Sequence, residues 1–292
     1  MQVYTHHHIG KRSAQEDFLG YSNATYIICD GVGGHKKGDK ASQFIVNQLL
    51  EACSKNPWQN IDQFKQRLIA AQEQLNALLV NNPEWEKMGT TLVALLEIKD
   101  RWYTVHIGDS RLILARPKAQ KIWHTWDHSF VMHLVKMGEI SREDARLHPR
   151  ANEIQKAIMA NTQQEVAEPE IHELTNIKKG DLILMCTDGI TEVFSDYELA
   201  KILTNKHITT KIKSETIFSQ ASNKAKDNNT AIIIEFESNS AKSKTQLDNW
   251  FTLKQLENDF SLAKQEPIQK QDSEKARGKK SLITWLSKII NR

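Results

Sequence analysis

Four aspartates in this chain stand at the ends of apolar segments that have the composition of buried strands. Asp30 follows residues 26–29, Asp109 follows 105–108, Asp188 follows 182–187, and Asp227 precedes 231–234. A carboxylate in apolar surroundings costs free energy unless it is paired or binds a metal ion. Because hard divalent cations take oxygen ligands, we expect the four carboxylates to converge on one shared site for such ions.

A glycine-rich loop follows the first of these aspartates, with the sequence Asp30-Gly31-Val32-Gly33-Gly34. Glycines let the backbone approach a bound ion closely, and a carbonyl such as that of Gly31 can be a ligand. A tight turn without any ligand explains the loop about equally well. The loop is not a nucleotide-binding P-loop, because the Gly-Lys-Ser/Thr ending is missing.

Length and composition suggest one large domain, alone or with an appendage, since the chain has 292 residues of which 39% are hydrophobic. No apolar run reaches the roughly 18 residues of a membrane span, and the first residues do not have the pattern of a signal peptide. The three cysteines show no metal-binding spacing. We therefore expect a protein of the reducing cytoplasm.

Charge is unevenly distributed along the chain, whose formal net charge is +3. Residues 240–292 hold 11 Lys and Arg against 6 Asp and Glu, so the basic excess lies at this end. The main body lacks the basic surface of a nucleic-acid-binding protein, and we expect no nucleic-acid partner.

Residues 1–237 alternate between strand patterns and amphipathic helix patterns, which predicts an α+β layered domain rather than a doubly wound parallel sheet. The expected strands are 2–9, 18–22, 24–29, 90–98, 101–107, 111–116, 120–125, 170–174, 181–186 and 230–236. The expected helices are 38–53, 60–81, 129–138, 196–204 and 208–225. Short turns between neighbouring strands indicate antiparallel pairing.

Residues 127–165 form a polar helical insertion between strands. A helix is expected to begin after Asp127-His128-Ser129 and to end at Gly138, and Ser141 has the features of the next N-cap. Such an insertion suggests a surface flap that covers a site.

The composition changes after residue 238, so we divide the chain into a body, 1–238, and an extension, 239–292. Within the extension, Leu247, Trp250, Phe251 and Phe260 suggest a short helix, and residues 264–280 have the composition of a disordered segment. Apolar residues from Leu282 to Ile290 recur with helical spacing beside basic ones. This basic amphipathic stretch fits docking on a protein partner or its own body, an anionic membrane surface, or an unstructured tail.

The most specific feature is an ordered set of six motifs. They are Arg12-Ser13-Ala14-Gln15-Glu16-Asp17, Asp30-Gly31-Val32-Gly33-Gly34-His35, Gly89-Thr90-Thr91, Gly108-Asp109-Ser110-Arg111, Thr187-Asp188-Gly189 and Asp227-Asn228-Asn229-Thr230. In this order and spacing the chain resembles the metal-dependent Ser/Thr protein phosphatases of type 2C (the PPM family) in their bacterial form. The resemblance runs from about Gly10 to Phe236 and does not cover the extension.

The resemblance implies a four-layer αββα sandwich, in which two antiparallel sheets are flanked by helices. It also implies a role for each matching residue. Asp30, the carbonyl of Gly31, Asp188 and Asp227 match ligands of two Mn²⁺ or Mg²⁺ ions, Asp30 bridges the ions, Glu16 and Asp17 touch them through water, Asp109 matches a ligand of a third, weaker ion, and Arg12 grips the substrate phosphate. The expected partners are phosphorylated proteins, including a Ser/Thr kinase and its substrates.

These residue types suit that chemistry on physical grounds. Two cations about 3.5–4 Å apart can acidify a bridging water and stabilise both ends of an in-line displacement, so hydroxide attacks directly and no phosphoenzyme is needed. An arginine offers a phosphate two parallel hydrogen bonds. We therefore expect hydrolysis of phosphoserine and phosphothreonine in proteins.

Two departures from the family pattern concern the site. Val32 stands where many eukaryotic members have the histidine proposed as general acid, which leaves a metal-bound water, His35 or His128 as candidates. Gln15 replaces a common asparagine. A catalytically silent phosphoprotein-binding scaffold is the alternative function, and the joint retention of Arg12 and the metal-binding aspartates disfavours it.

Overall fold

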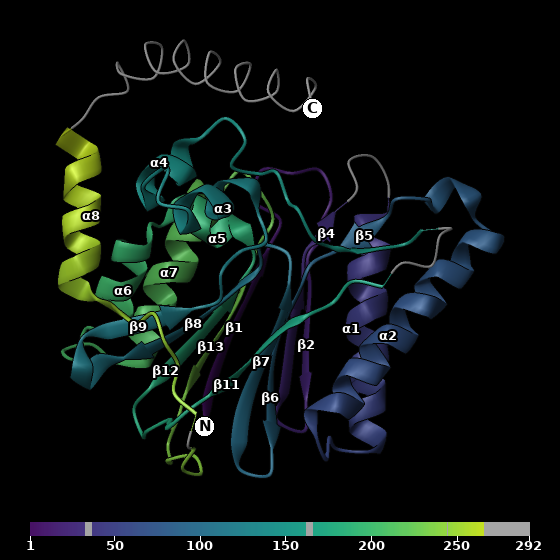
Figure 1. Ribbon diagram of the computed structural model, residues 1–292, viewed down its shortest axis with the longest axis horizontal. Helices are drawn as coiled ribbons and strands as arrows, with labels where there is room; N and C mark the ends of the chain where they lie inside the picture. The colour runs from purple at the N-terminus through teal and green to yellow at the C-terminus, as the bar shows by residue number, and fades with distance from the viewer. Residues whose placement is uncertain (33–36, 162–165, 244, 266–292) are drawn as a thin grey trace, which may run out of the picture.

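Two stacked antiparallel sheets form the centre of the computed structural model, which describes residues 1–32, 37–161, 166–243 and 245–265. Helices cover the outer face of each sheet (Figure 1). The expected αββα sandwich is therefore confirmed.

The larger sheet has six strands. In spatial order they are β1 (Gln2–His8), β13 (Asn229–Glu235), β12 (Leu182–Cys186), β8 (Arg111–Arg116), β9 (Lys121–His124) and β14 (Phe251–Thr252). The five-stranded sheet runs β11 (Glu170–Leu174), β7 (Arg101–Ile107), β6 (Leu92–Ile98), β3 (Thr25–Cys29) and β2 (Phe18–Ser22). A small sheet joins β10 (Ile158–Met159), β5 (Gly89–Thr90) and β4 (Gly31–Val32).

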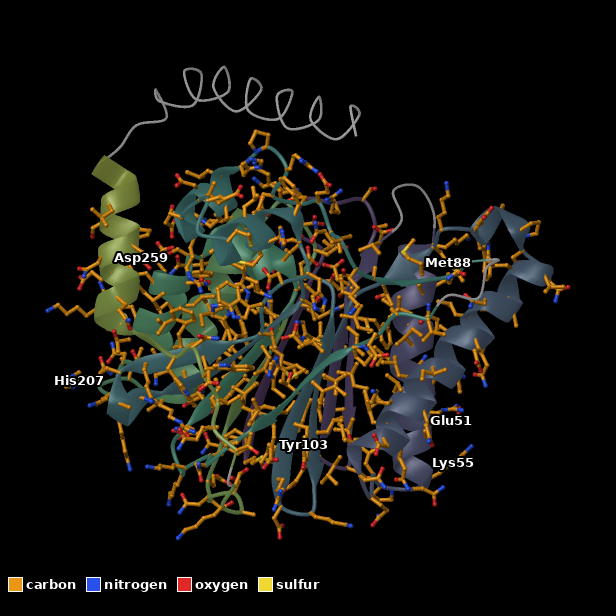
Figure 2. All side chains as sticks on the ribbon, viewed as in Figure 1. Glu51, Lys55, Met88, Tyr103, His207 and Asp259 are labelled. Carbon is orange, nitrogen blue, oxygen red and sulfur yellow. The ribbon has the colours of Figure 1, made fainter. Side chains whose placement is uncertain are left out.

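The central strands are apolar throughout because both of their faces are buried. In β12, Ile183 and Met185 point between the two sheets, whereas Leu182, Leu184 and Cys186 point to the helices. The alternation follows from the two-residue period of a strand. Figure 2 shows side chains filling the space between the layers.

Two long helices, α1 (Gly38–Lys55) and α2 (Ile61–Ala77), cover the five-stranded sheet. The six-stranded sheet is covered by α5 (Asp188–Val193), α6 (Asp196–Leu203) and α7 (Thr210–Lys224), and α8 (Leu253–Gln265) packs beside α6 (Figure 1). Short 3-10 turns lie at Leu78–Val80, Pro83–Trp85 and Pro117–Ala119.

The flap contains two short helices, α3 (Phe130–Lys136) and α4 (Arg142–Leu147). Ser141 begins α4 with a capping box, in which its hydroxyl accepts the amide of Asp144 and the Asp144 carboxylate accepts the amide of Ser141. The predicted N-cap is therefore confirmed.

All ten expected strands are present with small shifts of their ends. The sequence patterns missed α5 and the two-residue strands β4, β10 and β14, and the short β5 was merged with β6. The helix expected in the extension begins only at Leu253, because Phe251 belongs to β14.

No described helix is both long enough and apolar enough to cross a membrane. The amphipathic stretch from Leu282 to Ile290 lies outside the described residues, so its docking partner stays a prediction. The division of the chain near residue 238 also stays a prediction.

Candidate metal centre

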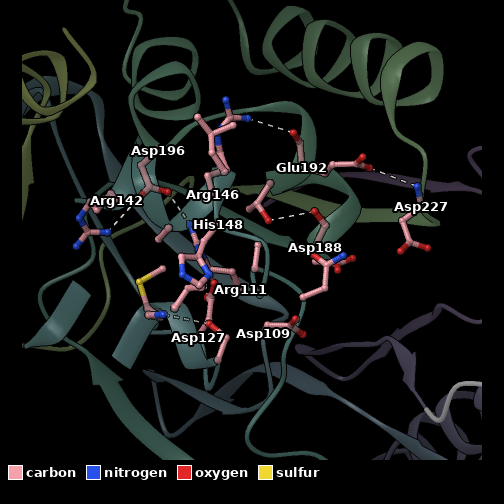
Figure 3. A pocket seen from close by; sticks show the side chains of 18 of the residues that line it. Asp109, Arg111, Asp127, Arg142, Arg146, His148, Asp188, Glu192, Asp196 and Asp227 are labelled. Atoms are coloured by element: carbon pink, nitrogen blue, oxygen red, sulfur yellow. Dashed lines mark hydrogen bonds and ion pairs between the residues drawn. The ribbon is translucent and has the colours of Figure 1, made fainter. Parts of the chain in front are cut away.

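Four aspartates from separate elements meet at one end of the sandwich. Asp17 precedes β2, Asp30 lies between β3 and β4, Asp109 follows β7, and Asp188 opens α5 directly after β12. Each of the other three carboxylates raises the pKa of Asp30, after the larger effect of burial. Of the four aspartates expected to converge, Asp30, Asp109 and Asp188 thus lie in this cluster, and Asp227 is near enough to raise the pKa of Asp30 as well. Figure 3 shows Asp109 and Asp188 facing the same space.

This cluster carries negative charge that no described residue neutralises in full. One oxygen each of Asp17, Asp109 and Asp188 is buried without a hydrogen-bond partner among the described residues. Burial raises the pKa of Asp17 and of Asp109 to about 7, and burial together with neighbouring carboxylates raises the pKa of Asp188. A bound divalent cation would remove both the repulsion and the desolvation cost.

The backbone around Asp30 is fixed by two threonines. The carbonyl of Asp30 accepts the Thr90 hydroxyl at 2.9 Å and the Thr91 amide at 2.8 Å, and the Asp30 amide donates to the Thr91 hydroxyl at 3.0 Å. Gly31 is required next to it, since a Cβ there would lie 2.3 Å from the carbonyl carbon of Gly38 in α1. The backbone of Gly31 is thereby packed closely against α1, and its carbonyl as a metal ligand stays a prediction.

Asp188 is positioned by close contact between α5 and the loop before β13. A Cβ on Gly189 would lie 2.1 Å from the carbonyl oxygen of Asn228, so only glycine fits. The Thr187 hydroxyl accepts the amide of Thr230 at 3.0 Å. These contacts explain why a small residue follows Asp188.

The loop of residues 9–16 carries Arg12 and Glu16 to the rim of the cluster. Asn228 holds this loop, because its side-chain amide donates to the carbonyls of Ile9 and Ala14, and its oxygen accepts the amide of Glu16. Arg12 is 58% exposed and donates two hydrogen bonds to Asp227, one of them 2.8 Å long. Asp227 therefore faces the arginine, while half-buried Glu16 lies near both.

Asn228 is a positioning residue that the motif search missed. It lay within the motif Asp227-Asn228-Asn229-Thr230, but nothing local to the motif indicates that its side chain reaches residues more than 200 positions away.

A buried ion network lies behind Asp109 and joins it to the flap. Arg111 donates to Asp127 and Asp196, and Asp196 also accepts Arg142 of α4 at 2.9 Å. The pKa of Asp196 is lowered because the attraction of these arginines outweighs its burial. Arg111, which belongs to the same motif as Asp109, is thus paired with Asp127 and Asp196.

His128 uses both ring nitrogens for structural bonds. Its Nδ1 accepts the amide of Gly108 at 3.0 Å, so the neutral ring carries its proton on Nε2, which lies 3.3 Å from Glu170. His128 therefore fixes the turn before Asp109, which argues against a role as general acid. The other histidine candidate, His35, lies outside the described residues.

A cavity of about 650 Å³ opens beside the carboxylates and beneath the flap. Asp109, Asp188 and Asp227 line one side, and Arg142, Arg146 and His148 of the flap line the other (Figure 3). The cavity is large enough for a phosphorylated side chain with its neighbouring residues.

Comparison with known proteins matches residues 5–225 to the family model of protein phosphatase 2C. A serine/threonine phosphatase, stp, of Listeria innocua is 32% identical over 218 residues, which cover 72% of this chain and 83% of that protein. The structure of the phosphatase Stp1 from Staphylococcus aureus is 28% identical with a TM-score of 0.71, covering 81% of this chain and 95% of the other.

A structure of the catalytic domain of the phosphatase PstP in complex with two manganese ions is 25% identical, with a TM-score of 0.67 over 82% of this chain and 98% of that domain. The match of the family model covers five of the six motifs and ends at residue 225, just after α7, and the sixth motif at residues 227–230 follows directly after it. The chain is a member of the protein phosphatase 2C family, in its bacterial form.

Proposed function

We propose that this protein hydrolyses phosphoserine and phosphothreonine in proteins with the help of two Mn²⁺ or Mg²⁺ ions. The observation that carries the proposal is the buried carboxylate cluster, in which Asp17, Asp109 and Asp188 each have an oxygen without a partner among the described residues. Membership of a phosphatase family supports the same conclusion.

The residues present fit such ions. Asp30, Asp188, Asp227 and the Gly31 carbonyl would hold the pair, Glu16 and Asp17 would bind their water ligands, and Asp109 would hold a third ion. When bound, the ions lower the pKa of water and neutralise phosphate charge. The chain contributes rigid placement, because the threonine contacts at Asp30 and the glycine contacts at Gly31 and Gly189 leave little freedom at these positions.

Arg12 is the residue that we assign to the substrate phosphate. It lies at the rim, it is more than half exposed, and its guanidinium already makes a two-pronged contact with a carboxylate, Asp227. A cation bound to Asp227 would compete with Arg12 for the negative charge of this carboxylate. Metal binding at Asp227 would therefore weaken its contact with Arg12 and favour binding of Arg12 to a phosphate.

The size of the cavity fits a substrate as large as a peptide. Lys226 adds positive charge to its wall, while Arg111 and Arg142 are neutralised by Asp127 and Asp196, and Arg146 is paired with Glu143. This arrangement suits a phosphorylated segment of a protein, such as a kinase activation segment or a kinase substrate.

The test is hydrolysis of a phosphothreonine peptide by the full chain with Mn²⁺, with Mg²⁺ and with EDTA. The proposal expects turnover that requires the metal. Phosphopeptide binding without release of phosphate under any metal condition would instead support the silent scaffold.

A further inference from the structure

The start of the C-terminal extension packs on the catalytic body, although the family match ends at residue 225. Phe251 in β14 pairs with Ile122 of β9 and so adds a strand to the edge of the larger sheet. Leu256 of α8 is buried, and Glu257 accepts the hydroxyl of Tyr197 in α6. Figure 1 shows α8 standing alongside α6 and reaching the level of α4.

Phe251 contacts the flap directly, through Arg142 of α4. The guanidinium of Arg142 lies 4.1 Å from the centre of the Phe251 ring and 4.6 Å from that of Trp126. The Phe251 ring also stacks on His124, with 5.3 Å between the ring centres. Arg142 is thus enclosed by aromatic faces, which favour a cation above them.

The enclosed arginine is tied to the wall of the cavity. Arg142 donates to Asp196 at 2.9 Å, and Asp196 also accepts Arg111 at 2.6 Å. Arg111 stands two residues after Asp109 in the chain. In the other direction, α4 continues into Arg146 and His148, which line the cavity. The position of α4 therefore sets both the cavity wall and the support behind Asp109.

We propose that Phe251 is a positioning residue, through which the C-terminal extension holds the flap against the cavity for binding of the phosphoprotein. The inference rests on the proposed phosphatase function for its kinetic consequence, but the structural part is independent of it. Without the Phe251 ring, Arg142 is exposed to water on one side and α4 is less firmly held. Contacts of the flap with a peptide then weaken, while contacts of a small phosphate ester with Arg12 do not change.

Trp250 provides a matched control. It directly precedes β14 and packs against the core between the two sheets, whereas Phe251 packs against the core under the helices. The Arg116 guanidinium and the Lys121 ammonium lie 4.4 and 4.3 Å from the centre of the Trp250 ring. Trp250→Ala therefore removes an aromatic anchor of the same extension without touching Arg142. Phe251→Tyr keeps the ring face and serves as the conservative variant.

Steady-state kinetics of the full-length variants gives the first measurement. In Phe251→Ala we expect the KM for a phosphothreonine peptide to rise about fivefold, with kcat and the hydrolysis of p-nitrophenyl phosphate changed less than about twofold. Phe251→Tyr and Trp250→Ala should behave like the parent. Equal peptide KM values for Phe251→Ala and the parent would overturn the proposal. An equal loss of kcat/KM for the peptide and for p-nitrophenyl phosphate in Phe251→Ala would overturn it too.

Amide hydrogen exchange of the same proteins tests whether Phe251 holds α4 in place, and this measurement does not depend on enzymatic activity. We expect α4 to exchange faster in Phe251→Ala than in the parent and Phe251→Tyr. Unchanged exchange of α4 in Phe251→Ala would overturn the proposal. If Trp250→Ala increases the exchange of α8, the exchange of α4 must increase as well. Exchange of α4 that stays slow while α8 exchanges fast would also overturn the proposal. If α4 exchanges faster in Phe251→Ala but the parent protein hydrolyses no phosphopeptide, the positioning role of Phe251 stands and only the phosphatase function is refuted.

Discussion

The hydroxyl of Thr187 donates a 2.9 Å hydrogen bond to the carboxylate of Asp17, which lies 170 positions earlier in the chain. Thr187 follows β12 of the six-stranded sheet, and Asp17 precedes β2 at the edge of the five-stranded sheet. The bond therefore connects the two sheets directly beneath the carboxylate cluster. It also partners one oxygen of Asp17 and leaves the other for a ligand.

Replacing Thr187 by valine keeps the shape of the side chain and removes two hydrogen bonds, one to Asp17 and one from Thr230. We expect a loss of about 2–3 kcal/mol in the free energy of unfolding and about 10–100-fold weaker Mn²⁺ binding. Urea unfolding and calorimetric titration measure the two effects. Thr187→Ser should retain most of the stability and most of the affinity for Mn²⁺. A valine variant with the same stability and affinity as the serine variant would contradict this account.

Removing the Arg12 guanidinium should impair catalysis without unfolding the protein, because this side chain is largely exposed. We expect Arg12→Ala to lower kcat/KM by about 10–100-fold. Arg12→Lys should recover only part of the loss, since an ammonium group cannot make the two-pronged contact. Arg67→Ala on α2, where the arginine bonds Gln48, is the control and should match the parent. Full recovery by lysine would argue against two-pronged binding.

Stabilisation by Mn²⁺ should grow as the pH rises from 6 to 8. The pKa of Asp17 and of Asp109 is about 7 in the folded protein and 3.8 as the ordinary value. Folded-state protonation of these groups stabilises the metal-free protein at low pH, and this contribution is lost as the pH rises through 7. Deprotonation also makes the cluster a better ligand for cations.

The measurement is the difference in Tm between Mn²⁺ and EDTA at each pH. His106 and His124 have a pKa lowered by burial to about 4, so their contribution grows as the pH rises from 4 toward 6.5. It is the same with and without Mn²⁺ and cancels in the difference. A Tm difference that stays constant or shrinks toward pH 8 would refute the raised pKa values.

The strands and the convergence of aspartates could be predicted because both depend on local patterns. An apolar run that ends in Asp30 or Asp188 indicates a core strand and a carboxylate at its end. Because β3 and β7 are both antiparallel to β6, they run in the same direction, and Asp30 and Asp109 follow their ends at one edge of the sheet. The N-cap at Ser141 could be predicted for the same reason, because its capping box involves only Ser141 and Asp144.

The features that the sequence did not predict depend on contacts between residues that are distant in the chain. The side chain of Asn228 holds a loop more than 200 positions away, and Arg111 is paired with Asp196 of another element. Strand β14 has two residues, too few for any periodic pattern, and exists only because β9 offers an open edge. The role of Phe251 follows from that pairing and not from its neighbours in the sequence.

The central claim is that the carboxylates act together to hold the catalytic metal ions, and Asp188→Asn tests it most directly. The change preserves shape, and removal of one repelling charge should raise the Tm in EDTA. We expect Mn²⁺-dependent turnover of a phosphothreonine peptide to fall at least about 100-fold, while Asp62→Asn on the surface of α2 leaves it unchanged. Turnover by Asp188→Asn at the parent rate, with the same Mn²⁺ requirement, would contradict the account.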